Sequence, residues 1–164
     1  MEIITIENKK DEKFLRQKTA DFDFVKFKKP EIRALIKTMR KIMKNANGIG
    51  LSANQIGLNT KVFVAQAPSE KGGSKFYTIF NPKITKVSGE TVELEEGCLS
   101  VPDKWGLVTR PEKIILEGLD INGKNIKIKA WGPLARVFQH EIDHLNGKLF
   151  IDRTKKITTL RRNQ

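Results

Sequence analysis

The order of strand-like and helix-like segments constrains the fold of this chain more than any other feature. Apolar and polar residues alternate, at the two-residue period of β-strands, in five segments: 61–66, 75–80, 91–96, 112–120 and 124–131. The last two segments flank an Asn122-Gly123 pair, which is typical of a tight hairpin turn. Strands grouped between helices favour antiparallel pairing, so the sequence predicts an α+β fold with mostly antiparallel sheets.

Two amphipathic helices are expected to enclose these strands. In residues 30–46 apolar residues recur every three or four positions, and the segment begins with Pro30 and is followed by Gly48. The second helix begins near Pro133 and stops at Gly147. Its apolar residues form one stripe that we expect to be buried: Leu134, Val137, Phe138, Ile142 and Leu145.

Length and composition indicate a single folded unit. The chain has 164 residues, and we assign residues 1–152 to one domain and residues 153–164 to a short basic tail. No apolar run approaches the ~20 residues that span a bilayer, and the N-terminus lacks the apolar core of a signal peptide. We therefore expect a cytoplasmic protein without membrane contact. The single cysteine excludes an intramolecular disulfide.

The net charge of +12 is concentrated at the two ends of the chain. Residues 1–44 carry 13 Lys and Arg against 7 Asp and Glu, residues 45–152 carry 13 against 12, and residues 153–164 carry 5 against none. Contact with a polyanion such as ribosomal RNA is one interpretation, and a solvated surface that aids solubility is the other. The tail has no aromatic residue for base stacking, so sequence-specific nucleic-acid binding is not expected.

The only two histidines of the chain, His140 and His144, stand four residues apart in the second predicted helix. This spacing places both imidazoles on one helix face, where they can hold one metal ion. With Glu141 they form the H-E-x-x-H pattern, in which the glutamate is the general base of a metal hydrolase. Two structural histidines are the alternative. The strong helix pattern and the cost of burying an idle glutamate favour the metal site.

A catalytic metal site also needs a third protein ligand and an open coordination position. After His144 the sequence contains no histidine, glutamate or cysteine, and Asp152 is its one carboxylate. The third ligand must therefore lie upstream, where Cys98 is the one soft candidate. Gly97 before it permits a close approach of the backbone. An inert buried thiol is the alternative interpretation of a lone cysteine, and the need for a third ligand outweighs it.

The glycine-rich segment 48–53 matches the dinucleotide-binding pattern G-x-G-x-x-A. That pattern must follow a strand, whereas this segment follows a predicted helix, so nucleotide binding is rejected. A glycine-lined edge along which another backbone lies is the better interpretation. Gln55 could supply an amide donor beside it.

Three motifs, in this order and at this spacing, closely resemble peptide deformylase: GIGLSANQIG (48–57), EGCLS (96–100) and QHEIDHLNG (139–147). The resemblance extends through three shorter segments: NPKI (81–84), SGET (88–91) and RPEKI (110–114). It covers most of residues 10–152. The family removes the formyl group from the N-terminal formylmethionine of new bacterial or organellar proteins and releases formate. The resemblance implies antiparallel sheets packed around a central helix that carries HEIDH, with an N-terminal helix.

The same resemblance implies a metal-dependent mechanism. One divalent ion per chain, Fe²⁺ first and Zn²⁺, Ni²⁺ or Co²⁺ as alternatives, would be bound by three ligands: Cys98, His140 and His144. Glu141 would take a proton from the attacking water and pass it to the leaving amine. The Gln55 amide and the Leu99 backbone N–H would join the metal in stabilising the negative charge on the formyl oxygen.

Substrate contacts are implied for six residues: Ile49, Gly50, Leu94, Gly97, Trp105 and Val137. Ile49 and Gly50 would hold the backbone of a formylmethionyl nascent peptide as an added strand. Leu94 and Val137, together with His140, would line the pocket for the methionine side chain.

Some positions differ from the usual pattern of the family. Position 52 is serine where alanine is usual, a small change that we expect to be tolerated. Trp105 stands where many relatives carry arginine or another polar residue, so preference beyond methionine stays open. Many bacterial members end in a longer C-terminal helix, so ribosome docking by that helix is not carried over. Asp143 would crowd His140 at the metal, and we expect it to be structural and paired with Arg110.

Two other functions are compatible with parts of this pattern. A metalloprotease or another amide hydrolase could use the same ligand set, and cleavage of an unformylated peptide would favour it. A catalytically inactive relative could act as a ribosome-binding or RNA-binding module. The intact Gln55, Cys98 and Glu141, with both histidines, argue against an inactive binder, which would need none of them.

Overall fold

The computed structural model describes residues 1–68 and 72–159. Its helices and strands, in chain order, are α1 (Lys9–Leu15), α2 (Lys29–Asn45), β1 (Gly50–Ser52), β2 (Val62–Pro68), β3 (Ser74–Val87), β4 (Thr91–Cys98), β5 (Val101–Pro111), β6 (Lys113–Leu119), β7 (Asn125–Trp131), α3 (Gly132–Leu145) and β8 (Ile157–Thr159). Short 3₁₀ helices lie at Phe24–Lys26, Ala53–Ile56 and Phe150–Asp152. The predicted α+β class is confirmed.

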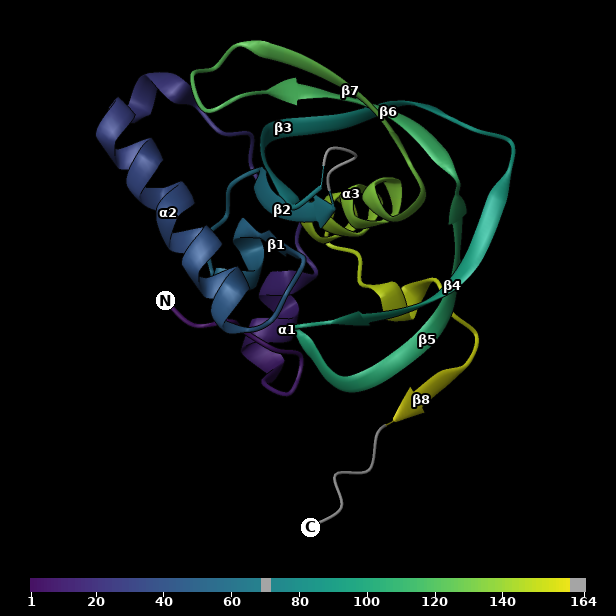
Figure 1. Ribbon diagram of the computed structural model, residues 1–164. Coiled ribbons are helices and arrows are strands. Elements are labelled where there is room, and N and C mark those ends of the chain that lie inside the picture. The colour runs from purple at the N-terminus through teal and green to yellow at the C-terminus, as the bar shows by residue number, and fades with distance from the viewer. Residues whose placement is uncertain (69–71, 160–164) are drawn as a thin grey trace.

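The strands form two antiparallel sheets. The larger sheet has the order β1-β2-β3-β6-β7, and the smaller has the order β4-β5-β8. Figure 1 shows helix α3 in the centre of the molecule, with the sheets curving around it and α2 on the outer side of β1 and β2. The central placement of the helix that carries HEIDH is as expected.

Strand β2 separates two parts of the hydrophobic core. Val62 and Val64 pack into the cluster that contains the buried face of α2. Phe63 and Ala65 point the other way, into the cluster that contains the buried face of α3. Successive side chains of a strand face opposite sides of the sheet. Because both sides of β2 are covered by a helix, its apolar run is nearly continuous.

The smaller sheet covers another side of α3. Val101 and Val108 of β5 pack with Leu149 and Phe150, which follow α3 in the chain. Strand β8 pairs with β5, opposite Lys104, Trp105 and Gly106. It lies in the first part of the predicted basic tail, and residues 160–164 of that tail lie outside the described residues.

Most of the predicted elements are confirmed, and several were missed. Both amphipathic helices, the five strand segments and the Asn122-Gly123 hairpin are present, and β6 pairs antiparallel with β7. The N-terminal helix that the family resemblance implies is also present. The residue patterns themselves did not predict α1, β1, β5 or β8. Within the described residues, no helix has the length and apolarity needed to cross a membrane.

Candidate metal centre

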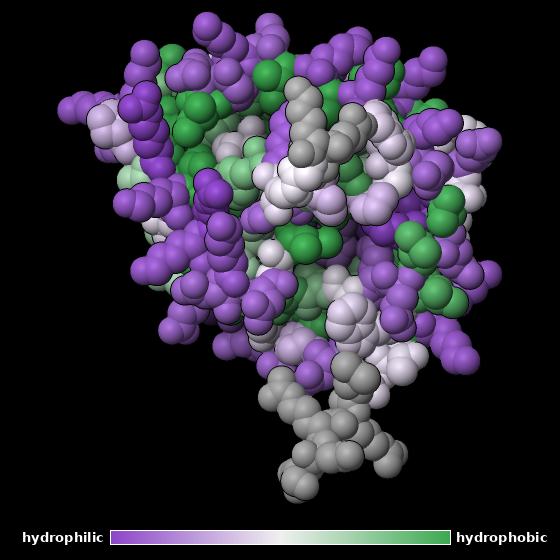
Figure 2. All heavy atoms as spheres, viewed as in Figure 1, coloured by the Kyte–Doolittle hydropathy of each residue, from purple (hydrophilic) through white to green (hydrophobic). Residues whose placement is uncertain are grey.

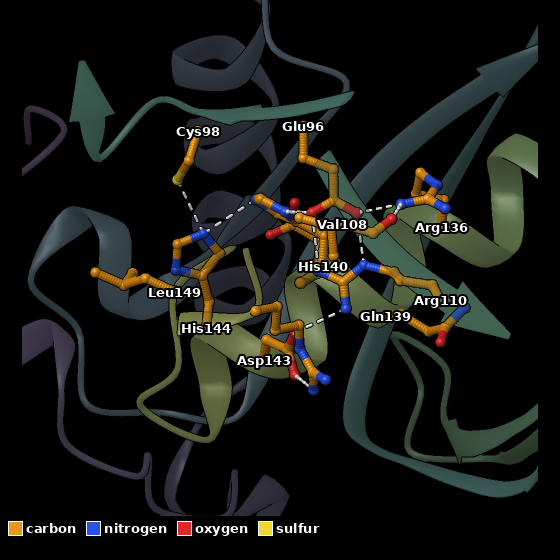
Figure 3. Close-up of polar contacts among 12 residues, drawn as sticks. Glu96, Cys98, Val108, Arg110, Arg136, Gln139, His140, Asp143, His144 and Leu149 are labelled. Atoms are coloured by element: carbon orange, nitrogen blue, oxygen red, sulfur yellow. Dashed lines mark hydrogen bonds and ion pairs between the residues drawn. The ribbon is translucent and has the colours of Figure 1, made fainter. Parts of the chain in front are cut away.

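Three potential metal ligands converge between α3 and the end of β4. Cys98 Sγ lies 3.1 Å from His144 Nε2, which lies 3.2 Å from His140 Nε2. All three donor atoms lie within 4.8 Å of one another. Figure 3 shows Cys98 above the ring of His144, on the side that faces His140. One sulfur and two imidazole nitrogens at this separation fit a single divalent ion, with room left for a further ligand.

Local structure explains why these side chains meet. The two histidines are one turn apart on α3, so their rings lie on the same helix face, with centroids 4.9 Å apart. The pairing of β4 with β5 shifts register between Gly97 and Cys98, so that Cys98 stands opposite Val101. This irregularity ends the regular ladder at the residue that must reach α3.

Glu96 fixes the orientation of His140. Its Oε2 lies 3.0 Å from His140 Nδ1, and Arg110 donates two hydrogen bonds to the same carboxylate, at 2.6 and 2.9 Å. Arg136 donates a further one at 2.7 Å. With Nδ1 directed at a carboxylate, Nε2 is the nitrogen left for a metal. Figure 3 shows this network on the side of His140 away from Cys98.

The same network determines the charge of Glu96. Burial alone would raise the pKa of this carboxyl, but hydrogen bonds from Arg110 and His140, with their positive charges, hold it well below its usual range. Glu96 is therefore an anion that compensates the buried guanidinium of Arg110 and the half-buried guanidinium of Arg136. The sequence could have indicated this role. Glu96 and Cys98 are two residues apart, and residues at this spacing lie on the same face of a β-strand.

Asp143 is structural, as expected. Arg110 Nη1 donates to its Oδ2 at 2.8 Å, and Arg153 also donates to both carboxylate oxygens. Arg110 is only 2% exposed, so its two carboxylate partners supply the compensation that a buried guanidinium requires. The pairing of Asp143 with Arg110 is confirmed, and the contribution of Arg153 was not foreseen.

The two histidines differ in their affinity for protons. Burial would lower the pKa of His140, but Cys98 and Glu96 raise it to about 10. Burial lowers the pKa of His144 well below its usual value, and the charge of His140 lowers it further. A metal ion must therefore compete with a proton at His140. In the described residues, His144 Nδ1 is a buried nitrogen without a hydrogen-bond partner.

Glu141 lies beside the ligands and is only 3% exposed. Burial raises its pKa to about 6, against the opposing effects of the His140 charge and a hydrogen bond from Ser52. Ser52 Oγ donates to Glu141 Oε2 at 2.7 Å. A carboxyl with this pKa is mostly ionised at neutral pH and can still accept and release a proton readily, as a general base must.

Gln55 presents its amide nitrogen to the ligand cluster. The Ser52 backbone N–H donates to Gln55 Oε1 at 2.9 Å, which fixes the amide so that Nε2 points the other way. Nε2 donates to Ser100 Oγ at 3.1 Å and lies 3.7 Å from Cys98 Sγ. The amide is therefore a preorganised donor next to the metal ligands.

A cavity of about 500 Å³ opens in front of these groups. Its wall includes eleven of the twelve residues that the sequence singled out: Ile49, Gly50, Gln55, Leu94, Gly97, Cys98, Leu99, Trp105, Val137, His140 and Glu141. His144 is not part of the wall, but its Nε2 lies beside Cys98 Sγ and His140 Nε2. Figure 2 shows hydrophilic side chains over most of one face of the molecule, with hydrophobic ones visible in the hollow at its centre.

Two glycines of the cavity are required by close neighbours. A Cβ at Gly50 would lie 2.2 Å from Glu141 Oε1, and a Cβ at Gly97 would lie 2.6 Å from the ring of Trp105. The first glycine lets the carboxylate of Glu141 lie directly over β1. The second lets Trp105 lie flat against the strand that ends in Cys98. Both glycines are points of close approach, but the close neighbours are the side chains of Glu141 and Trp105, whereas the sequence was interpreted as admitting another backbone.

Comparison with known proteins identifies the family. A family model described as Polypeptide deformylase matches residues 1–160. The peptide deformylase of Thermodesulfovibrio yellowstonii is 45% identical over 132 residues, which cover 80% of this chain and 78% of that protein. The crystal structure of a probable peptide deformylase from Synechococcus phage S-SSM7 matches with a TM-score of 0.83 at 42% identity, covering 93% of this chain and 99% of that one. The Met-Ala-Ser-bound peptide deformylase of Acinetobacter baumannii matches with a TM-score of 0.84 at 29% identity, covering 93% and 97%. The chain therefore belongs to the peptide deformylase family of metallohydrolases.

Proposed function

We propose that this protein hydrolyses the formyl group from the N-terminal formylmethionine of newly made peptides and releases formate. The observation that carries the proposal is the convergence of Cys98, His140 and His144 donors within 4.8 Å, with Glu141 in the wall of the same cavity. Three protein ligands leave a coordination position open, as a catalytic site requires and a structural site does not.

A thiol and two imidazoles suit several divalent ions of the first transition row. We propose Fe²⁺ as the resident ion, following the family resemblance, with Zn²⁺, Ni²⁺ or Co²⁺ as substitutes. Such an ion supplies Lewis-acid chemistry, since it polarises a carbonyl oxygen and acidifies water. Cys98, His140 and His144 would hold it, and Glu96 would keep His140 in the required orientation.

Glu141 would move the proton in the reaction. It would take a proton from the water that attacks the formyl carbon and deliver it to the nitrogen of the leaving amine as the carbon–nitrogen bond breaks. The products are then formate and a peptide with a free N-terminal amine. Its pKa of about 6 and its place in the cavity wall support this role.

Gln55 and Leu99 would stabilise the negative charge that develops on the formyl oxygen. The Gln55 Nε2 is held toward Cys98 by two hydrogen bonds of the amide group, and Leu99 follows the ligand Cys98 directly in the cavity wall. Preorganised donors of this kind are worth roughly 100-fold to 1000-fold in rate each.

The free edge of the larger sheet suits a peptide substrate. In the described parts of the chain, strand β1 pairs with β2 on one side only, and the Gln66 N–H donates to Ile49 O at 2.8 Å. Hydrogen-bonding direction alternates along an antiparallel strand, so the backbone groups of Gly50 are directed away from β2. We propose that Ile49 and Gly50 align the substrate here, with Leu94, Val137 and Trp105 around its side chains.

The location and partners are further parts of the proposal. We infer a cytoplasmic enzyme whose catalytic unit is residues 1–152, and whose basic ends contact the ribosome. The exposed lysines and arginines of α2, which include Arg33, Lys37 and Lys41, support an electrostatic contact. Cosedimentation with ribosomes tests it, because binding should weaken steeply as salt is raised and when these three side chains become glutamate.

The deciding experiment is anaerobic turnover of a formyl-Met-Ala-Ser peptide, with the metal content of the same sample determined. Deformylation at about one metal per chain is the expected result. The unformylated peptide is the control, because its cleavage would favour a general metalloprotease. A full metal site without turnover would contradict the proposed substrate and indicate another amide.

The identity of the ion has its own test. Fe²⁺ oxidises in air, so enzyme purified aerobically should lose activity while nickel-substituted enzyme keeps it. Equal lifetimes of the two preparations in air would argue that iron is not the working ion.

A further inference from the structure

Ser52 makes a buried contact with the proposed catalytic base. Its side chain is fully buried, and its Oγ lies 2.7 Å from Glu141 Oε2 and 3.0 Å from the Glu141 backbone oxygen. The hydroxyl has one proton to donate, and a carboxylate is the stronger of the two acceptors. The shorter distance also belongs to the carboxylate. The two residues are 89 positions apart in the chain, so this contact joins β1 directly to the middle of α3.

The contact distinguishes the two oxygens of Glu141. Oε2 is held by Ser52, whereas Oε1 lies over Gly50, where a Cβ would come within 2.2 Å of it. In the described part of the chain, no side chain donates a hydrogen bond to Oε1. Gly50 and Glu141 both belong to the cavity wall. Oε1 is therefore the oxygen left to exchange a proton with reactants in the cavity.

The same residue also fixes the second proposed catalytic group. The backbone N–H of Ser52 donates to Gln55 Oε1 at 2.9 Å, and this bond turns Gln55 Nε2 toward Cys98. Ser52 thus contacts the proposed base, Glu141, through its side chain, and the proposed oxyanion donor, Gln55, through its backbone N–H. Only the first of these two contacts depends on the identity of the side chain.

We propose that Ser52 is a positioning residue, whose hydroxyl holds Oε2 of Glu141 so that Oε1 alone takes the proton from water and returns it to the amine. This inference rests on the proposed function. A glutamate carboxylate rotates with little restriction about its last torsion. A fixed hydrogen bond removes that freedom and keeps the basic oxygen aligned while the proton is on it, because Oε2 remains an acceptor throughout.

The test compares the metal-loaded wild type with Ser52→Ala and Ser52→Thr on formyl-Met-Ala-Ser. The alanine variant should lose about tenfold in kcat, the lower end of what one hydrogen bond to a charged group is worth. Its KM and metal content should stay at the wild-type values, because the Ser52 hydroxyl contacts neither the proposed peptide-binding residues Ile49 and Gly50 nor a metal ligand. Threonine keeps the hydroxyl and should restore most of kcat.

A matched control is offered by another buried hydroxyl that contacts the same helix, α3. Thr19 is also buried, and its hydroxyl donates to the Leu145 backbone oxygen of α3 at 3.0 Å. Its partner Leu145, unlike Glu141, does not belong to the cavity wall. Thr19→Val should therefore lower stability and leave kcat unchanged. Loss of kcat in this control similar to that of Ser52→Ala would show a general effect of removing buried hydroxyls, and would overturn the inference.

The outcomes separate this inference from the proposed function. Wild-type enzyme that carries a metal and does not deformylate the peptide would refute both. Active wild type with a Ser52→Ala variant of equal kcat would refute the inference alone. Loss of metal or a raised KM that accounts for the slower rate would also refute it, as would a threonine variant as slow as the alanine variant.

Discussion

Glu96 and His140 are joined by a 3.0 Å hydrogen bond between a carboxylate oxygen and the imidazole Nδ1, and this bond decides which nitrogen faces Cys98. The carboxylate is itself held by Arg110 and Arg136. The orientation of one ligand therefore depends on charged groups of the smaller sheet and of α3 that never reach the ion. Outer partners of this kind affect metal affinity although they never touch the ion.

Replacing Glu96 with glutamine should weaken metal binding roughly 10-fold to 100-fold. The amide removes the negative charge that orients His140 and compensates Arg110. Competition with a chelator of known affinity measures the change. Glu93→Gln is the control, since Glu93 is exposed on the same strand. The metal affinity of this variant should match that of the wild type. Unchanged affinity in Glu96→Gln would contradict the role assigned to this carboxylate.

Replacing Glu141 with glutamine should stabilise the protein at pH 8 and not at pH 4. Burial raises the pKa of Glu141 from 4.5 to about 6, so ionising this group in the folded state costs free energy. This cost is absent at pH values below the pKa of Glu141 in the unfolded chain. It is complete at pH values above the pKa in the folded protein, where it reaches about 2 kcal/mol.

The measurement for Glu141→Gln is the unfolding free energy at both pH values, after the metal has been removed with a chelator. The difference between variant and wild type should grow as pH rises through the interval from 4.5 to about 6. A difference that is the same at both pH values would show that ionisation of Glu141 is not its cause. The same variant should lose nearly all turnover while it keeps its metal.

Gly97→Ala should destabilise the protein by about 1–3 kcal/mol, because the new methyl group collides with the ring of Trp105. The two substitutions Gly97→Ala and Trp105→Ala should not be additive. Once the ring is gone, the methyl group at position 97 has space, so its cost should largely disappear. Chemical denaturation of the two single variants and the double variant measures this coupling. Additive effects would show that the ring does not lie against Gly97.

Two ion pairs should differ greatly in their contribution to stability. Asp143→Asn leaves the buried Arg110 with one carboxylate partner fewer and should cost about 3–5 kcal/mol. Asp152→Asn breaks the pair of Asp152 with Arg16, whose side chains are 37% and 33% exposed. It should cost less than about 1 kcal/mol. Unfolding free energies compare the two variants directly, and similar costs would contradict the burial argument.

The parts of the fold that follow from local patterns could be predicted from the sequence. Helices α2 and α3 have regular apolar spacing and clear end signals, and β6 and β7 are joined by Asn122-Gly123. The metal ligands also have local signals, since the histidine spacing fits one helix turn. Cys98 then followed from the absence of another soft donor.

The missed strands depend on pairing partners that no local pattern reveals. Strand β5 contains Pro102 and Pro111, and Asp103 within it has a left-handed φ of 58°, so it lacks the alternation of a regular strand. Strands β1 and β8 are three residues long and exist because β2 and β5 provide their hydrogen bonds.

The missed site residues have a similar explanation. Glu96 and Arg136 are charged, and charged residues are normally exposed. Glu96 is buried and Arg136 is half-buried here, because Glu96 pairs with both Arg136 and Arg110. Ser52 was interpreted as a tolerated replacement of alanine. Its partner on α3 is brought to it only by the tertiary fold.

The position of Cys98 has a mechanical consequence. A chain with one cysteine has no covalent cross-link, yet an ion bound by Cys98 and the two histidines would tie the end of β4 to α3 across the 41 residues that separate positions 98 and 140. A chelator would remove this metal cross-link, and added metal would re-form it. The bound ion would then cross-link the smaller sheet to α3, in addition to its part in catalysis. Trp105 belongs to this same sheet.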